Sequence, residues 1–108
     1  MRRIEQVNEL LRKELGTIVA REVPLEDGLI TITYVKCTLD LKNARVGISV
    51  IPDNNQLSAL KRLRRCNSLF TEYLHKRTRL SHIPHFTWEI DKDIENFNEI
   101  DVLLNGSR

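Results

Sequence analysis

Apolar residues recur every three or four positions through the first part of the chain, which is the spacing of a helix with one buried face. The stripe consists of Ile4, Val7, Leu11, Leu15 and Ile18. Pro24 follows, and the residue before a proline is disfavoured in helical geometry. The pattern therefore predicts a helix from Arg3 to about Arg21. Gly16 lies inside it, where it either allows a close packing contact or is a tolerated cost of about 1 kcal/mol relative to alanine.

The spacing then changes to that of strands. After the turn residues Glu26-Asp27-Gly28, residues 29–39 are rich in β-branched side chains, with mixed alternation that predicts a bulge or a change of facing near Tyr34. From Ala44 to Val50 apolar and polar residues alternate strictly. We expect these two segments to form an antiparallel hairpin with one buried face.

Helical spacing returns after Pro52. A helix is predicted from Gln56, with Asn54 or Asn55 as its N-cap. Three residues of low helix propensity, Cys66-Asn67-Ser68, then predict a kink or a broken turn. A second helical piece is expected to run to about Arg79.

A last strand opens at Ile83-Pro84 and continues through alternating residues to Ile90. A short acidic helix is expected over residues 94–104, and residues 105–108 are expected to be mobile. The order α-β-β-α-(kink)-α-β predicts one α+β domain spanning residues 1–104. In it a three-stranded sheet is covered by helices on one face.

Charge is distributed unevenly along this chain of net charge +2. Between Lys61 and Arg79 there are seven Lys/Arg and one acid, Glu72, whereas Glu89 to Asp101 contains six acids and one base. The basic window favours a polyanion such as RNA, although a solvated helix face is the plainer interpretation. The candidate RNA-binding residues are Lys61, Arg62, Arg64, Arg65, Asn67, Ser68, Lys76, Arg77 and Arg79.

Other kinds of chemistry find little support in the sequence. The two cysteines, Cys37 and Cys66, occur outside any CxxC motif, which indicates reduced thiols and a cytoplasmic protein. No window approaches 18 apolar residues, so no membrane span is predicted.

His75, His82 and His85 lack the spacing of a metal site. The aromatic residues Tyr73, Phe86 and Trp88 could stack on bases, but their spacing favours the core. Nothing resembles a nucleophile with an orienting base, so we expect neither an enzyme nor a cofactor.

The element order, taken with three sequence stretches, resembles the ribosome-binding factor A family. The stretches are Ala20-Arg21-Glu22-Val23, the hairpin segment 40–46, and Arg79-Leu80 to Ile83-Pro84 continuing through Phe86 to Asp91. The resemblance implies a type II KH-like fold. It also implies a non-enzymatic assembly factor that binds free small ribosomal subunits and their precursor rRNA and assists late maturation of the rRNA 5′ end. We further expect the protein to be a monomer.

In KH domains a GxxG loop between two helices clamps backbone nucleotides. The resemblance implies a kink of the form Ala-x-Gly in its place, where this chain has Cys66-Asn67-Ser68. Two alternatives stay open at the level of sequence. One is a KH-like module for another structured RNA, and the other is a protein-interaction domain that uses the acidic tail and a sheet edge.

Overall fold

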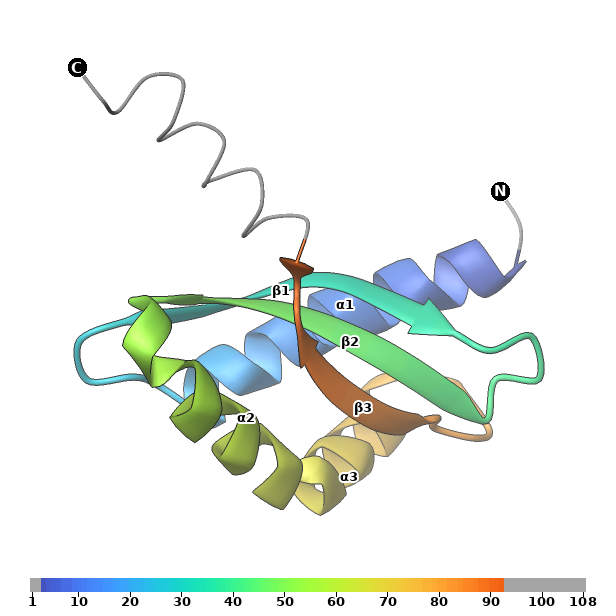
Figure 1. Ribbon diagram of the computed structural model, residues 1–108. Helices are drawn as coiled ribbons and strands as arrows, with labels where there is room; N and C mark the ends of the chain where they lie inside the picture. Colours follow the sequence, from blue (N-terminus) through green and yellow to red (C-terminus); the bar gives the residue numbers. More distant parts are fainter. Residues whose placement is uncertain (1–2, 93–108) are drawn as a thin grey trace.

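The computed structural model describes residues 3–92. The elements are helix α1 (Arg3–Glu22), strands β1 (Leu29–Cys37) and β2 (Asn43–Ile51), a short 3-10 turn η1 (Asp53–Asn55), helices α2 (Gln56–Arg65) and α3 (Asn67–Arg77), and strand β3 (His85–Ile90) (Figure 1). This order confirms the predicted α+β fold. The helix predicted over residues 94–104 and the tail 105–108 lie outside the described residues.

The three strands form one sheet in the order β1-β2-β3. The β1–β2 pair is antiparallel, as predicted, whereas β3 runs parallel to β2. Parallel neighbours need a long crossover, and α2 with α3 supplies it. Strand β1 contains one irregularity, because Ile32 pairs with Ile48 and Tyr34 with Gly47, which leaves Thr33 between them. The bulge or change of facing expected near Tyr34 is confirmed as a shift in register at this point.

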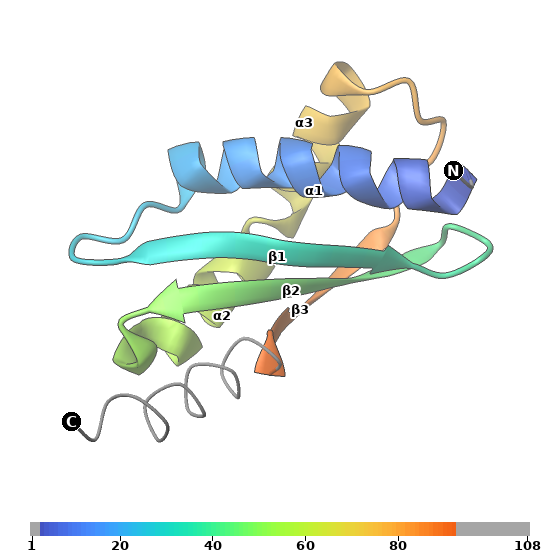
Figure 2. The same cartoon turned by 90° about the horizontal axis from the view of Figure 1, so that it is seen from above.

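The hydrophobic core lies between one face of the sheet and the helices. Helix α1 runs alongside β1 (Figure 2), and its side chains Leu11, Leu15 and Ile18 are fully buried. Helices α2 and α3 add Leu63 and Phe70 to the same cluster. The alternate residues of β2 from Ala44 to Val50 complete it. The other face of the sheet carries mostly polar residues, so the predicted one-sided arrangement is confirmed.

Two local predictions differ from the structure. The predicted side-chain cap of α2 is wrong, since Asn55 makes no capping hydrogen bond. Instead the 3-10 turn leads into the helix, and the backbone N–H of Gln56 donates to the carbonyl of Asp53. Helix α3 ends at Arg77 rather than Arg79, because Thr78 is extended. Gly16 has nothing within 4 Å of its Cβ position, so it makes no close packing contact.

Candidate nucleic-acid interface

Helix α2 presents three cations on its solvent side. Lys61, Arg64 and Arg65 are exposed, whereas Ala59 and Leu63 on the opposite side are fully buried. Positions 64 and 65 lie on the same side of the helix as position 61, because they follow it by three and four residues. Among the residues that the structure describes, none of the three forms an ion pair. We call these three residues the α2 basic face.

Arg62 points elsewhere and has a structural contact. Its Nη1 donates to the carbonyl oxygen of Pro24 at 3.1 Å, which ties α2 to the connection between α1 and β1. A hollow beside the helix is lined by Lys61, Arg62 and Arg65 together with Leu57. Arg62 therefore contributes positive charge near the α2 basic face while holding the helix in place.

Helices α2 and α3 meet at a single residue, Cys66. Its backbone lies at φ −91° and ψ 4°, and its N–H donates to the carbonyls of Leu63 at 3.1 Å and Arg62 at 3.2 Å. The predicted break is therefore a kink between two helices. Because φ is negative, the kink does not need glycine. The lack of a glycine in Cys66-Asn67-Ser68 therefore causes no backbone strain.

Asn67 connects this kink to the sheet. Its Oδ1 accepts a hydrogen bond from Nε1 of Trp88 at 2.7 Å. Trp88 is 2% exposed, and its ring meets that of Phe70 edge-on at 5.6 Å. The neighbouring Ser68 is exposed. Of the two predicted contact residues at the kink, Asn67 therefore has a structural hydrogen bond and Ser68 faces solvent.

The first turn of α3 is open to an anion. It contains no acidic residue and no side-chain cap. The first N–H groups of a helix have no partner within it and carry partial positive charge. The start of α3 adds this positive potential at the kink, beside the basic end of α2.

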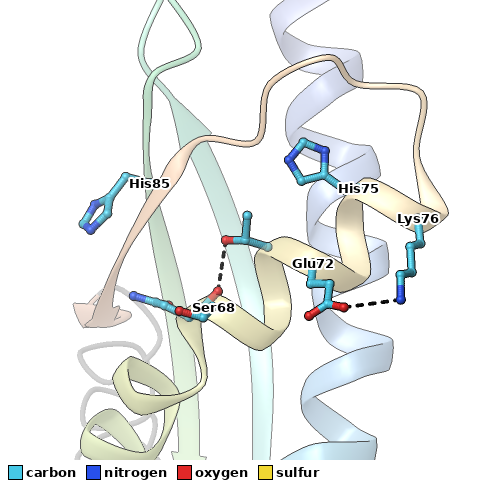
Figure 3. Close-up of a pocket in the computed structure, with 7 residues that line it drawn as sticks. Ser68, Glu72, His75, Lys76 and His85 are labelled. Carbon is cyan, nitrogen blue, oxygen red and sulfur yellow. Dashed lines mark hydrogen bonds and ion pairs between the residues drawn. The ribbon is translucent and has the colours of Figure 1, made fainter.

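A groove follows the exposed side of α3 (Figure 3). Its lining comes from α3 and from the start of β3, and consists of Asn67, Ser68, Thr71, Glu72, His75, Lys76 and His85. Lys76 forms an ion pair with Glu72 at 3.3 Å, and both side chains are well exposed. Such a pair is weak and screened by salt, so Lys76 can exchange Glu72 for a phosphate at little cost.

The last two predicted cations lie away from the kink. Nε of Arg77 is 3.4 Å from Oε2 of Glu14, which joins α3 to α1. The guanidinium of Arg77 also lies over the Tyr73 ring at 5.9 Å, and that of Arg21 lies over the same ring at 5.3 Å. Arg79 is exposed beyond the end of α3. The nine predicted residues thus occupy several surfaces rather than one.

Sequence reasoning missed a second cluster of charged side chains on the open face of the sheet. This sheet-face cluster consists of Tyr34, Lys36, Arg45 and Glu89. Arg45 donates from Nε and Nη2 to the two carboxylate oxygens of Glu89 at 3.0 and 2.7 Å. The Tyr34 hydroxyl donates to the same carboxylate. The Nζ of Lys36 lies 4.6 Å from the centre of the Tyr34 ring.

Contacts within the cluster shift the pKa values of Glu89 and Tyr34. Hydrogen bonds from Arg45 and then Tyr34 lower the pKa of Glu89 below its usual value. Burial and the bond to Glu89 raise the pKa of Tyr34 to about 12. Glu89 is therefore ionised at neutral pH and Tyr34 is protonated. The alternation in β2 and β3 marked Arg45 and Glu89 as outward-facing, but their meeting depends on the parallel register.

Other residues considered from the sequence take different places. Phe86 and Trp88 are core residues, so neither can stack on a base. His75, His82 and His85 are exposed. Residues 3–92 contain no group of three side chains placed to hold a metal ion. The helices in the same range also lack the combination of length and apolar character that crossing a bilayer requires.

Comparison with known proteins decides the family. The family described as ribosome-binding factor A matches residues 3–104. A ribosome-binding factor A from Natranaerobius thermophilus is 34% identical over 104 residues, covering 94% of this chain and 79% of that protein. The chain belongs to the ribosome-binding factor A family. The resemblance inferred from the sequence is thereby confirmed.

Solved structures of the family share the fold. The crystal structure of ribosome-binding factor A from Thermus thermophilus matches with a TM-score of 0.72 at 19% identity, covering 81% of this chain and 93% of that one. A homology model of the Thermus thermophilus factor, fitted into a cryo-EM map of a 30S complex, matches with a TM-score of 0.64 at 20% identity. That match covers 79% of this chain and 91% of the other.

Proposed function

We propose that this protein is a non-enzymatic assembly factor of the small ribosomal subunit. It binds free small subunits and their precursor rRNA in the cytoplasm, as a monomer, and assists late maturation of the rRNA 5′ end. The observation that carries the proposal is the α2 basic face, where three exposed cations have no ion-pair partner among residues 3–92, in a chain of the ribosome-binding factor A family. The Thermus thermophilus factor fitted into a map of a 30S complex gives further support.

The geometry suits contact with the phosphate backbone. Lys61, Arg64 and Arg65 project from one rigid helix, and the open first turn of α3 follows directly at the kink. Phosphate contacts position a protein on RNA and release counterions, so they supply affinity without reading sequence. We infer that specificity for the small subunit comes from the shape of its rRNA.

The mechanism in this proposal is binding and release rather than bond chemistry. The protein stabilises one arrangement of a flexible rRNA segment, and the mature arrangement displaces it. A partner that binds one of two conformations more tightly shifts the equilibrium by that difference in affinity. The screened pair between Lys76 and Glu72 fits such reversible contact, because Lys76 can return to Glu72 on release.

Sedimentation tests the proposal directly. The purified protein is mixed with free small subunits, assembled ribosomes or naked rRNA and pelleted at several salt concentrations. We expect retention on free small subunits and on precursor rRNA, declining as salt rises, with little retention on assembled ribosomes. Equal retention on any structured RNA would indicate a general KH-like module. No binding to subunits or RNA at low salt would leave the protein-interaction alternative.

A charge-reversal variant tests whether α2 and α3 make the contact with RNA. Arg65→Glu with Lys76→Glu places acids on both sides of the kink, and we expect subunit affinity to fall at least about tenfold. The matched control is Arg3→Glu with Lys13→Glu on α1, which makes the same change in net charge on another surface. Co-sedimentation of the first variant like wild type would contradict the proposal, provided that circular dichroism shows both variants folded.

A further inference from the structure

The open face of the sheet places two cations side by side. In the register of β1 and β2, Lys36 lies directly opposite Arg45, and both are exposed. Like charges in opposite positions of an antiparallel pair destabilise the sheet unless something compensates them. Lys36 and Arg45 therefore require compensating negative charge from a neighbouring side chain or from a ligand.

The next row of the sheet supplies the compensation. Tyr34 pairs with Gly47 on β2, and Gly47 pairs in turn with Glu89 on β3. A Cβ at position 47 would lie 2.1 Å from the Tyr34 ring, so only glycine lets that ring cross β2. The hydroxyl of Tyr34 thereby reaches the carboxylate of Glu89, which also holds Arg45.

Within the sheet-face cluster the compensation is incomplete, because the carboxylate of Glu89 faces two cations. Glu89 receives two hydrogen bonds from Arg45 and one from Tyr34. Lys36 has no ion-pair partner within the described part of the chain and contacts the Tyr34 ring instead. Arg45 engages Glu89 through Nε and Nη2, which leaves the Nη1 group outside this pair. The result is a fixed guanidinium beside an ammonium group.

This cluster is continuous with the α2 basic face. Lys36 and Arg45 from the sheet line the same hollow as Arg64 from α2. Among the residues that the structure describes, the hollow is lined by four cations, Lys36, Arg45, Arg64 and Lys92, and by two carboxylates, Glu89 and Asp91. The excess of positive charge suits an anionic ligand.

We propose that Lys36 and Arg45 form a second region of RNA phosphate contact, so that the RNA bound by α2 continues past β3 onto the open face of the sheet. This inference rests on the proposed function. Three observations favour RNA phosphate as the occupant. Among the described residues that line the hollow the cations outnumber the carboxylates. The guanidinium of Arg45 is held in place by Glu89, and the hollow joins the cluster to Arg64. Glu89 and Tyr34 act as positioning residues, since they hold Arg45 and need not touch the RNA.

The test compares two neutralised variants that lose the same charges. Lys36→Gln with Arg45→Gln removes one lysine and one arginine from the sheet face, and Arg3→Gln with Lys13→Gln removes one of each from α1. Binding is measured on naked small-subunit rRNA and on free small subunits over a salt series. We expect the sheet-face variant to lose about tenfold or more in affinity. Its log-log salt slope should fall by about 1.4, at about 0.7 per contact. The control should stay within about twofold of wild type.

Each outcome separates the two proposals. If wild type binds neither RNA nor subunits, the proposed function fails. If wild type binds and the sheet-face variant keeps its affinity and salt slope, only the second contact region is overturned. A loss on subunits without a loss on naked rRNA also overturns it, because the surface then meets a ribosomal protein. If the double variant unfolds, the single variant Lys36→Gln is used instead. It should stay folded, because Lys36 forms no ion pair within residues 3–92. An unchanged RNA affinity of this variant would overturn the second contact region.

Discussion

Because Gly47 has no Cβ, the ring of Tyr34 can lie across β2 and its hydroxyl can reach Glu89 on the open face of the sheet. An added Cβ would lie 2.1 to 2.6 Å from three atoms of the Tyr34 ring, whereas one at Gly16 would meet nothing within 4 Å. The two glycines therefore differ in what they do. Gly47 permits the contact of Tyr34 with Glu89, and Gly16 only lowers the helix propensity of α1.

The two glycines should respond oppositely to alanine. We expect Gly47→Ala to destabilise the fold by about 1 to 3 kcal/mol, because the ring of Tyr34 must move from a packed position. Gly16→Ala should stabilise by up to about 1 kcal/mol, since alanine favours the helix. Urea denaturation of both variants gives the two free energies of unfolding. Equal effects would refute this assignment of Gly47.

Glu89 should make stability depend on acid pH. Its pKa is lowered in the folded protein by Arg45 and then Tyr34, so its stabilising contribution is present above the unfolded value of about 4.5. That contribution is lost as the pH falls through the folded pKa. Glu89→Gln keeps the shape of the side chain without the charge.

Denaturation of wild type and Glu89→Gln from pH 7 to pH 2 measures this dependence. We expect wild type to be the more stable at neutral pH and the difference to shrink as the pH drops below about 4.5. A difference that stays constant across the range would show that the ionisation of Glu89 contributes nothing to folding.

At the scale of elements, the kink between α2 and α3 is held from both sides. Backbone hydrogen bonds from Cys66 close the end of α2, and Asn67 fixes the start of α3 to Trp88 on β3. The position of the α2 basic face relative to the sheet therefore depends on this hydrogen bond and on that from Arg62 to Pro24, as well as on the core beneath it.

Substitutions at Asn67 distinguish its structural role from RNA contact. Asn67→Ala leaves the buried indole N–H of Trp88 without a partner and should cost about 1 to 3 kcal/mol of stability. Asn67→Asp keeps an acceptor oxygen, so it should retain most of that stability while its negative charge weakens RNA binding. The control Ser68→Ala changes an exposed side chain and should leave stability unchanged.

Thermal unfolding and RNA titration are measured together for these three variants. A normal melting temperature for Asn67→Ala would contradict the structural role of the hydrogen bond to Trp88. Unchanged RNA affinity in a folded Asn67→Asp variant would instead show that no phosphate lies near the kink.

The elements themselves could be predicted largely from the sequence. The stripe of α1, the alternation of β2 and the low helix propensity at Cys66-Asn67-Ser68 each follow from local spacing, and the structure confirms all three. The cap of α2 was predicted wrongly, because a 3-10 turn leads into the helix and Asn55 makes no side-chain capping hydrogen bond. Sequence spacing does not distinguish these two ways of starting a helix.

At the scale of the whole molecule, positive charge is placed by the fold and not only by the order of residues. Arg62 and Arg77 belong to the basic window but contact Pro24 and Glu14. Lys36 and Arg45 lie outside that window yet share a hollow with Arg64. These placements depend on long-range contacts and on the parallel register of β3, which local sequence patterns do not encode.

The salt dependence of RNA binding counts the contacts made by the whole surface. The α2 basic face together with Arg79 provides four exposed cations without ion-pair partners among the described residues. At about 0.7 per phosphate, they give a slope of about −3 in log affinity against log salt. The contact region proposed on the sheet face should steepen it to between −4 and −5 at about the same value per contact. Fluorescence titration over a salt series measures the slope, and a value near zero would exclude phosphate contact.

The buried indole of Trp88, which is hydrogen-bonded to Asn67, is also a natural fluorescent probe within the protein. Trp88 is the only tryptophan in the chain, and its indole is buried against Phe70 beside the kink. Its emission wavelength and its quenching by added iodide therefore report the packing at one defined place. Binding that straightens α2 and α3 will expose the indole and shift its emission to longer wavelength. Binding without a conformational change will leave the spectrum unchanged. These two events can therefore be distinguished without an attached dye.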